Sequence, residues 1–218
     1  MSARQKPRVK FPIVPEKTAA IVVDMQNEFV KPGAPIEVPD ARVMVPRLNR
    51  LLDACRASGI TVIFVQHILR GDGSDMGRLA DMHASIREGR SIRDGTENVE
   101  IYPELTVKPG DLTVRKSRYS SFHNTDLEAI LRTKGIETLI IGGCVTNVCC
   151  DSTARDAFSR DYKIIFLSDG NATHDYADMG FGPVSAEEAQ RVVLTVMACC
   201  FGQVASIGEV IQQIQPVS

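Results

Sequence analysis

Three residues whose side chains could together attack an amide follow three separate apolar segments of the chain. Asp24 follows residues 18–23 (TAAIVV), Lys116 follows residues 112–114, and Cys149 comes shortly after residues 138–141 (TLII). A carboxylate can take the proton of a thiol, an ammonium can stabilise the resulting charges, and a thiolate can attack a carbonyl carbon. An unperturbed thiol has a pKa of about 8.5, so attack near neutral pH needs such help. Asp24, Lys116 and Cys149 are therefore candidate catalytic residues.

Each of these residues also has a simpler structural interpretation. An aspartate after a strand often begins a turn, a lysine at a strand end is usually solvated, and a cysteine is commonly a core residue. The functional interpretation depends on their lying together. In an open parallel sheet, ligands bind beyond the carboxyl ends of the strands, and all three residues follow such ends if the apolar segments are parallel strands.

Cys149 is the favoured nucleophile among the cysteines. Gly142-Gly143 allows the chain to turn tightly, and Thr146 or Asn147 could cap a helix that begins there. Cys149 would then lie in the first turn of that helix, where free N–H groups and the helix dipole favour a thiolate and could hold an oxyanion. Cys150 would point about 100° away around the helix, so only one of the two can face the site.

The elements that position these residues alternate between strands and helices. Strands are expected at residues 18–23, 61–65, 112–114, 138–141, 163–167 and 204–206. Helices are expected at residues 45–55 and 126–132, after residue 185 and at the end of the chain. This alternation predicts βαβ units, and so an α/β domain with three α/β/α layers and a six-stranded, mostly parallel sheet. Ser185 and Glu188 form a predicted capping box for the long helix that follows them.

Residues 68–105 interrupt the alternation with a long segment rich in Gly, Asp and Arg. Segments of that length usually cover a site or bind something, and this one needs a surface to pack against. The alternative is a solvated excursion with one short helix around residues 77–87. Its arginines could hold a substrate carboxylate, although acidic neighbours favour surface ion pairs instead. These arginines are Arg70, Arg78, Arg87, Arg90 and Arg93.

The composition excludes several classes of protein. A chain of 218 residues, 44% of them hydrophobic, fits a single domain over residues 1–218, with an extended arm at residues 1–16. The net charge of −2 offers no strong field to nucleic acid or an anionic membrane surface. No apolar run approaches the roughly 20 residues of a membrane span, and the polar start does not resemble a secretory signal. The six cysteines lack zinc-site spacing, and the two adjacent pairs suit disulfides poorly, so we expect reduced thiols in the cytoplasm.

Three segments resemble the motifs of the isochorismatase-like cysteine hydrolases, in the order and with the spacing of that family. They are residues 22–29 (VVDMQNEF), residues 115–122 (RKSRYSSF) followed by 124–127 (NTDL), and residues 143–149 (GCVTNVC) followed by 152–157 (STARDA). The likeness runs from about residue 17 to residue 211. The second and third segments are most similar to those of ureidoacrylate and N-carbamoylsarcosine amidohydrolases.

The resemblance implies a triad of Asp24, Lys116 and Cys149 on a six-stranded parallel sheet, with no cofactor and no metal. It also implies a cis peptide between Cys144 and Val145, which would direct the backbone N–H groups of Val145 and Cys149 at the oxyanion. Relatives often complete the substrate pocket with a neighbouring subunit, so a homodimer or homotetramer is expected.

Four further residues are candidate substrate contacts. Phe29, Tyr119 and Phe122 closely follow the motif residues and could line a pocket, although each could equally be a core residue. His174 follows the fifth expected strand, where relatives of the resembled family place a residue that contacts the substrate.

The expected function is therefore that of a cysteine amidohydrolase, which cleaves a C–N bond of a small ureido or carbamoyl compound through a thioester and releases ammonia. A nicotinamidase is one alternative, but its Asp-x-His metal motif is replaced here by Gln66-His67-Ile68, with His83 far along the excursion. Isochorismate hydrolysis is a second, and the family members that perform it lack the nucleophilic cysteine. A non-catalytic binding domain on the same fold is a third.

Overall fold

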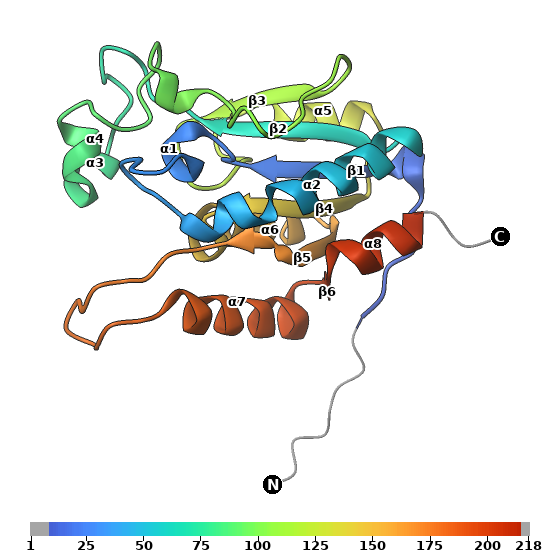
Figure 1. The fold of residues 1–218 in the computed structure, drawn as a ribbon. Coiled ribbons are helices and arrows are strands. Elements are labelled where there is room, and N and C mark those ends of the chain that lie inside the picture. Colours follow the sequence, from blue (N-terminus) through green and yellow to red (C-terminus); the bar gives the residue numbers. More distant parts are fainter. Residues whose placement is uncertain (1–8, 215–218) are drawn as a thin grey trace, which may run out of the picture.

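The structure, a computed structural model that describes residues 9–214, contains one six-stranded sheet (Figure 1). The strands lie in the order β3-β2-β1-β4-β5-β6, and every neighbouring pair is parallel. Their bounds are β1 Thr18–Val23, β2 Thr61–His67, β3 Leu112–Lys116, β4 Thr138–Cys144, β5 Lys163–Ala172 and β6 Gln203–Ala205. The predicted six-stranded α/β architecture is confirmed. Several strands run past their expected carboxyl ends because the ladder continues into polar residues such as His67, which pairs with Lys116.

Helices cover both faces of the sheet (Figure 1). On one face α2 (Pro39–Ala57) and α8 (Ile207–Ile214) pack over Ala20 and Val22 of β1. On the other face α5 (Leu127–Thr133), α6 (Asp151–Phe158) and α7 (Ala186–Cys200) pack over Ala19, Ile21 and Val23. Burial on both faces explains why β1 is apolar throughout. The predicted capping box of Ser185 and Glu188 is present at the start of α7.

The side of the sheet on which the chain adds new strands changes between β1 and β4. From β1 the chain adds β2 and β3 on one side, and from β4 it adds β5 and β6 on the other. Val23 at the end of β1 lies opposite Gly143 near the end of β4. Ligands of open α/β sheets bind at such a point, beyond the carboxyl ends of the strands. Asp24 and the segment that follows β4 therefore lie at the expected place for a site.

Residues 68–105 pack against their own chain, which supplies the surface that this segment was expected to need. Leu79, Ile86 and Ile92 are buried and belong to the same hydrophobic cluster as residues of β1 and α2. The expected single helix is divided into α3 (Leu79–Met82) and α4 (Ala84–Arg87), because His83 between them has an extended backbone. The remaining short elements are helix α1 (Asn27–Val30) and the 3-10 turns η1 (Pro15–Lys17) and η2 (Glu97–Val99).

The expected N-terminal arm is described only from residue 9, and its first eight residues lie outside the described part of the chain. Residues 9–14 form no helix or strand, but they are not detached from the domain. The backbone N–H of Phe11 donates to Gln203 Oε1 at 2.8 Å, and Phe11 and Ile13 pack against the core. Within residues 9–214, no helix combines the length and the apolar character needed to cross a membrane.

Candidate active site

Asp24, Lys116 and Cys149 meet at the carboxyl edge of the sheet. Lys116 Nζ lies 2.8 Å from Asp24 Oδ2 and 3.3 Å from Cys149 Sγ. It also donates to the backbone carbonyl of Arg118 at 3.0 Å. All three catalytic candidates are buried, and the ammonium lies within contact distance of both the carboxylate and the sulfur. The structure thus brings together the three residues that the sequence singles out.

The backbone around β1 and β4 aims the aspartate at this point. Asp24 has a positive φ of 52°, so the chain turns sharply as β1 ends, and its N–H donates to Val65 O at 2.9 Å. β4 passes so close to β1 that a Cβ on Gly143, whose φ is 133°, would overlap the carbonyl oxygen of Val23. Glycine is therefore required at position 143.

Cys149 lies in a π-helical turn, η3 (Thr146–Cys150), that continues directly into α6. This corrects the expectation of a helix capped by Thr146 or Asn147, since neither side chain caps it. Instead, Asn147 Oδ1 accepts hydrogen bonds from Thr173 Oγ1 at 2.6 Å and from Tyr176 Oη at 2.9 Å. Asn147 therefore connects the turn that carries Cys149 to the segment that follows β5.

The peptide bond between Cys144 and Val145, immediately before this turn, is cis. Cys144 and Cys150 are both fully buried, and neither lies on the wall of the cavity described below. Burial raises the pKa of both thiols well above its usual range. Cys149 is therefore the thiol of this cluster that faces the site.

The surroundings of Cys149 favour its protonated thiol over the thiolate. Burial and, next, the charge of Asp24 raise the pKa of Cys149 to about 12, with Lys116 acting in the opposite direction. This corrects the expectation that an early helical position favours the thiolate. Burial also raises the pKa of Asp24, and the charge of Lys116 acts in the opposite direction. For Lys116, burial lowers the pKa, but the charges of Asp24 and Cys149 outweigh it, so the pKa is raised. Cys149 accordingly needs a base to take its proton, and Asp24 is the adjacent carboxylate.

A cavity of about 260 Å³ opens onto Cys149. Most of its wall is apolar and consists of Phe29, Ile36, Ile86, Ile92, Val145 and Val148. The other residues that line it, besides Cys149, are His67, His83, Tyr119, His174 and Tyr176. Three of the four predicted substrate contacts, Phe29, Tyr119 and His174, thus lie on this wall.

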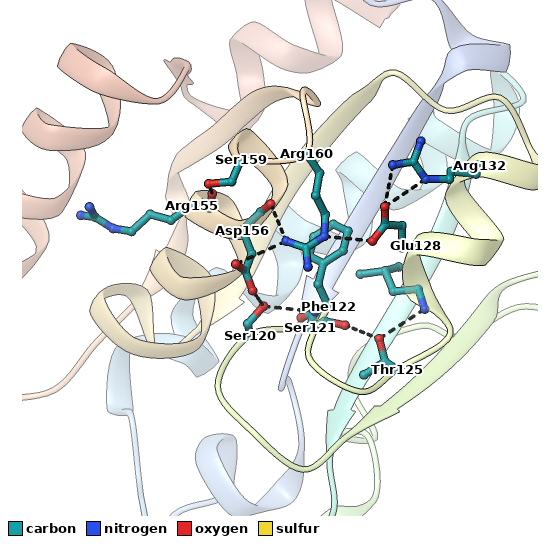
Figure 2. Close-up of polar contacts among 11 residues, drawn as sticks. Ser120, Ser121, Phe122, Thr125, Glu128, Arg132, Arg155, Asp156, Ser159 and Arg160 are labelled. Carbon is teal, nitrogen blue, oxygen red and sulfur yellow. Dashed lines mark hydrogen bonds and ion pairs between the residues drawn. The ribbon is translucent and has the colours of Figure 1, made fainter.

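Phe122 does not line the cavity, which corrects its expected role as a substrate contact. Its ring is buried in the core 5.9 Å from that of Tyr162, and the guanidinium of Arg160 lies 4.9 Å from its centroid. The cause is the path of the loop after Lys116, which turns beneath α6. Figure 2 shows the bond from Ser120 of this loop to Asp156, and it shows Arg160 bonded to Glu128 of α5 beside the Phe122 ring.

This loop also joins the lysine to the nucleophile segment. Ser121 N donates to Thr153 Oγ1 at 3.0 Å, and the two hydroxyl oxygens lie 2.9 Å apart. Thr153 belongs to α6, whose preceding turn carries Cys149. The loop between Lys116 and α5 therefore supports the spacing of Lys116 and Cys149, and Phe122 belongs to its buried side.

Among the described residues, no arginine of the 68–105 excursion lines the cavity. Arg78 pairs with Asp81 at 2.9 Å, and Arg90 pairs with Glu88, as the alternative interpretation of surface ion pairs expects. The excursion instead contributes His83, Ile86 and Ile92 to the wall, which the sequence alone did not indicate. A signal for His67 was present, because it follows the second strand at the same edge as the triad.

Asp24, His67 and Cys149 together have the residue types of a metal site, with one ligand atom from each lying within 4.8 Å of the others. The charges argue against a cation there. The Lys116 ammonium already lies 2.8 Å from the carboxylate and 3.3 Å from the sulfur, so a metal ion would face a buried positive charge. These residues therefore fit an ion pair and a thiol better than a metal ion.

Comparison with known proteins gives concordant results. The model of the isochorismatase domain matches residues 18–209. The chain is 33% identical over 238 residues to the ureidoacrylate amidohydrolase RutB of Agrobacterium fabrum, covering 100% of this chain and 99% of that protein. A cysteine hydrolase from Pseudomonas syringae pv. phaseolicola has a similar structure, with a TM-score of 0.94, 45% identity and 99% of both chains covered. An N-carbamoylsarcosine amidase from Thermoplasma acidophilum has a TM-score of 0.68 and 27% identity over 88% of this chain and 96% of that one.

Proposed function

The chain belongs to the isochorismatase family and is a hydrolase of C–N amide bonds; we propose that it cleaves a small ureido or carbamoyl compound through a thioester at Cys149 and releases ammonia. The observation that carries this proposal is the buried contact of Lys116 with both Asp24 and Cys149, of which Cys149 lines a small cavity. A thiol, a base and a cation in contact are the groups that nucleophilic cleavage of an amide requires.

In the first half of the reaction, Asp24 takes the Cys149 proton as Sγ bonds to the carbonyl carbon. The oxygen becomes an oxyanion, which we assign to the backbone N–H groups of Val145 and Cys149. When the C–N bond breaks, Asp24 gives its proton to the leaving nitrogen, and ammonia departs. Lys116 remains charged throughout and compensates first the carboxylate and then the forming thiolate.

In the second half, a water molecule replaces the amine. Asp24 takes a proton from this water as its oxygen attacks the thioester carbon, and the thiol leaves with the proton that Asp24 returns. Asp24 accepts and donates the proton in each transfer of this scheme. Because burial raises the pKa of Cys149, the thiol carries a proton that must be transferred in both halves, and we assign this transfer to Asp24.

The cavity wall favours uncharged substrates within this class. Among the described residues, no lysine or arginine lines the cavity, so a substrate carboxylate would have no permanently charged partner there. An adjoining hollow that shares Ile36 and His174 with the cavity carries Glu37, Asp40 and Asp175. These acidic groups disfavour an anion on electrostatic grounds.

The test is a measurement of ammonia release from a panel of biuret, n-butylurea, ureidoacrylate, N-carbamoylsarcosine and nicotinamide. We expect turnover of the carbamoyl compounds, with the highest kcat/KM for an uncharged one. Turnover of nicotinamide alone would contradict the substrate class and leave the triad in place. His174→Ala should raise KM more than it lowers kcat, because His174 contacts the substrate away from the reacting carbon.

We also propose that the protein acts in the cytoplasm as a homodimer or homotetramer. The segment after β5 forms an arm closed by the bridge between Tyr176 and Val184. Near its tip, Met179 and Phe181 are 81% and 98% exposed, as is typical of apolar residues that a partner covers. Sedimentation should show an oligomer, and Phe181→Ser should weaken it. A wild-type chain that is monomeric and fully active would contradict this proposal.

A further inference from the structure

His67 is held in place through its backbone by one buried side chain. Its N–H donates to Gln26 Oε1 at 2.8 Å, and Gln26 Nε2 donates back to its carbonyl oxygen at 3.1 Å. The same Nε2 donates to Val99 O at 2.8 Å, which attaches the end of β2 to the excursion. Both backbone polar groups of His67 are thereby fixed, and its side chain is presented to the cavity from a rigid strand end.

The ring of His67 presents an unused acceptor beside the nucleophile. It lies edge-on to Tyr119, with centroids 6.4 Å apart at 86°, and it is buried. Burial, followed by the charge of Lys116, lowers the pKa of His67 well below its usual value, while a hydrogen bond with the backbone of Ser117 acts in the opposite direction. Nε2 is fully buried and has no hydrogen-bond partner among the described residues. The bond with Ser117 raises the pKa of His67, so the ring donates in it, and because Nε2 has no partner we assign the donor to Nδ1–H. In that neutral ring Nε2 carries a lone pair and can accept.

The position of this acceptor matches the leaving group of an amide. One ring nitrogen of His67, Cys149 Sγ and an Asp24 carboxylate oxygen all lie within 4.8 Å of one another. With the carbonyl oxygen assigned to the backbone N–H groups of Val145 and Cys149, the nitrogen on a carbonyl carbon bonded to Sγ is within reach of both Asp24 and His67. A buried acceptor without a partner is unfavourable, so a substrate that donates an N–H there gains binding free energy.

We propose that His67 Nε2 accepts a hydrogen bond from the scissile –CO–NH2 group, so that His67 selects a primary amide and directs its nitrogen towards Asp24. This inference rests on the proposed amidohydrolase function and assigns a substrate-binding role to a residue outside the triad. A primary amide has two N–H groups, so one can contact His67 while the nitrogen lone pair stays available for the proton from Asp24.

The test compares n-butylurea with methyl N-butylcarbamate in wild type and in His67→Phe. Both substrates transfer the same butylcarbamoyl group to Cys149. The leaving group of the urea is an –NH2 group with two N–H donors, whereas that of the carbamate is a methoxy group with none. We expect kcat/KM for the urea to fall about 10- to 100-fold in the variant, and that for the carbamate to change by less than about threefold. His123→Phe is the matched control, because His123 is exposed and does not line the cavity.

An equal loss with both substrates would overturn the inference, because a ring that only fills space or supports the fold affects both alike. If His67→Phe does not fold, His67→Leu is measured with the same pair, and the same ratio decides. Failure of the proposed function gives a different result, in which wild type releases no ammonia from n-butylurea.

Discussion

Asp24→Asn is expected to change two reactions of Cys149 in opposite directions. Amide hydrolysis should fall by at least about a thousandfold, because the variant keeps the shape of the side chain but removes the base. Modification of Cys149 by methyl methanethiosulfonate should become faster, because the negative charge of Asp24 is one of the causes that raise the pKa of this thiol. Lys116, whose Nζ lies 3.3 Å from Sγ, remains in the variant and favours the thiolate.

The size of the increase follows from the separation of the two groups. A carboxylate oxygen of Asp24 lies within 4.8 Å of Cys149 Sγ. At an effective dielectric constant of about 20, two unit charges at that distance interact by about 3.5 kcal/mol, which corresponds to roughly 300-fold more thiolate below the pKa. A thiolate of lower pKa is also less nucleophilic, with a Brønsted slope of about 0.5, so the expected net gain in rate is roughly 15-fold.

The rate is measured at pH 8 by intact-protein mass spectrometry after timed quenching. Cys199 and Cys200 are exposed and will also react, so Cys149→Ser gives the background to subtract. Slower modification of Asp24→Asn, in proportion to its loss of hydrolysis, would refute the reasoning. It would mean that Asp24 does not oppose the thiolate in the resting enzyme.

Four other outcomes are expected. Cys149→Ser should abolish turnover and leave the melting temperature within a few degrees of wild type, whereas Cys150→Ser should retain most activity in the same ammonia assay. Lys116→Met should lower kcat/KM at least about a thousandfold and the free energy of unfolding by about 3 kcal/mol, measured in urea, because a buried carboxylate loses its partner. Burial raises the pKa of Glu28, so the folded state binds its proton more tightly, and stability should fall as pH rises through the folded pKa. Glu28→Gln should lose this slope in urea unfolding from pH 5 to 8. Incubation with EDTA should leave activity unchanged, and restoration of lost activity by a divalent metal would contradict the charge argument given for Lys116.

The candidate catalytic residues could be located from sequence because a parallel sheet brings all its carboxyl strand ends to one edge. Once the apolar segments around residues 18–23, 112–114 and 138–141 were interpreted as parallel strands, Asp24, Lys116 and Cys149 were expected at the same edge, and the observed strand order brings them into contact. The direction of Phe122 could not be predicted, because it depends on how one loop turns beneath α6.

Two further properties of the site depend on tertiary packing. The pKa of Cys149 is set mainly by burial, which overrides the effect of an early helical position. The apolar wall comes from residues far apart in the chain, such as Ile36, Ile86 and Val148, and their meeting has no local signal.

The origin of the cavity wall has a consequence for how such proteins diversify. The candidate catalytic residues lie just after β1, at the end of β3 and in the turn that follows β4, whereas His83, Ile86 and Ile92 come from the excursion, and His174 and Tyr176 come from the segment after β5. Changes in these two segments can alter the shape of the pocket without moving Asp24, Lys116 or Cys149. Natural variation in substrate among related chains should therefore be concentrated in these two segments, and a transplanted excursion should carry a new preference onto an unchanged reaction centre.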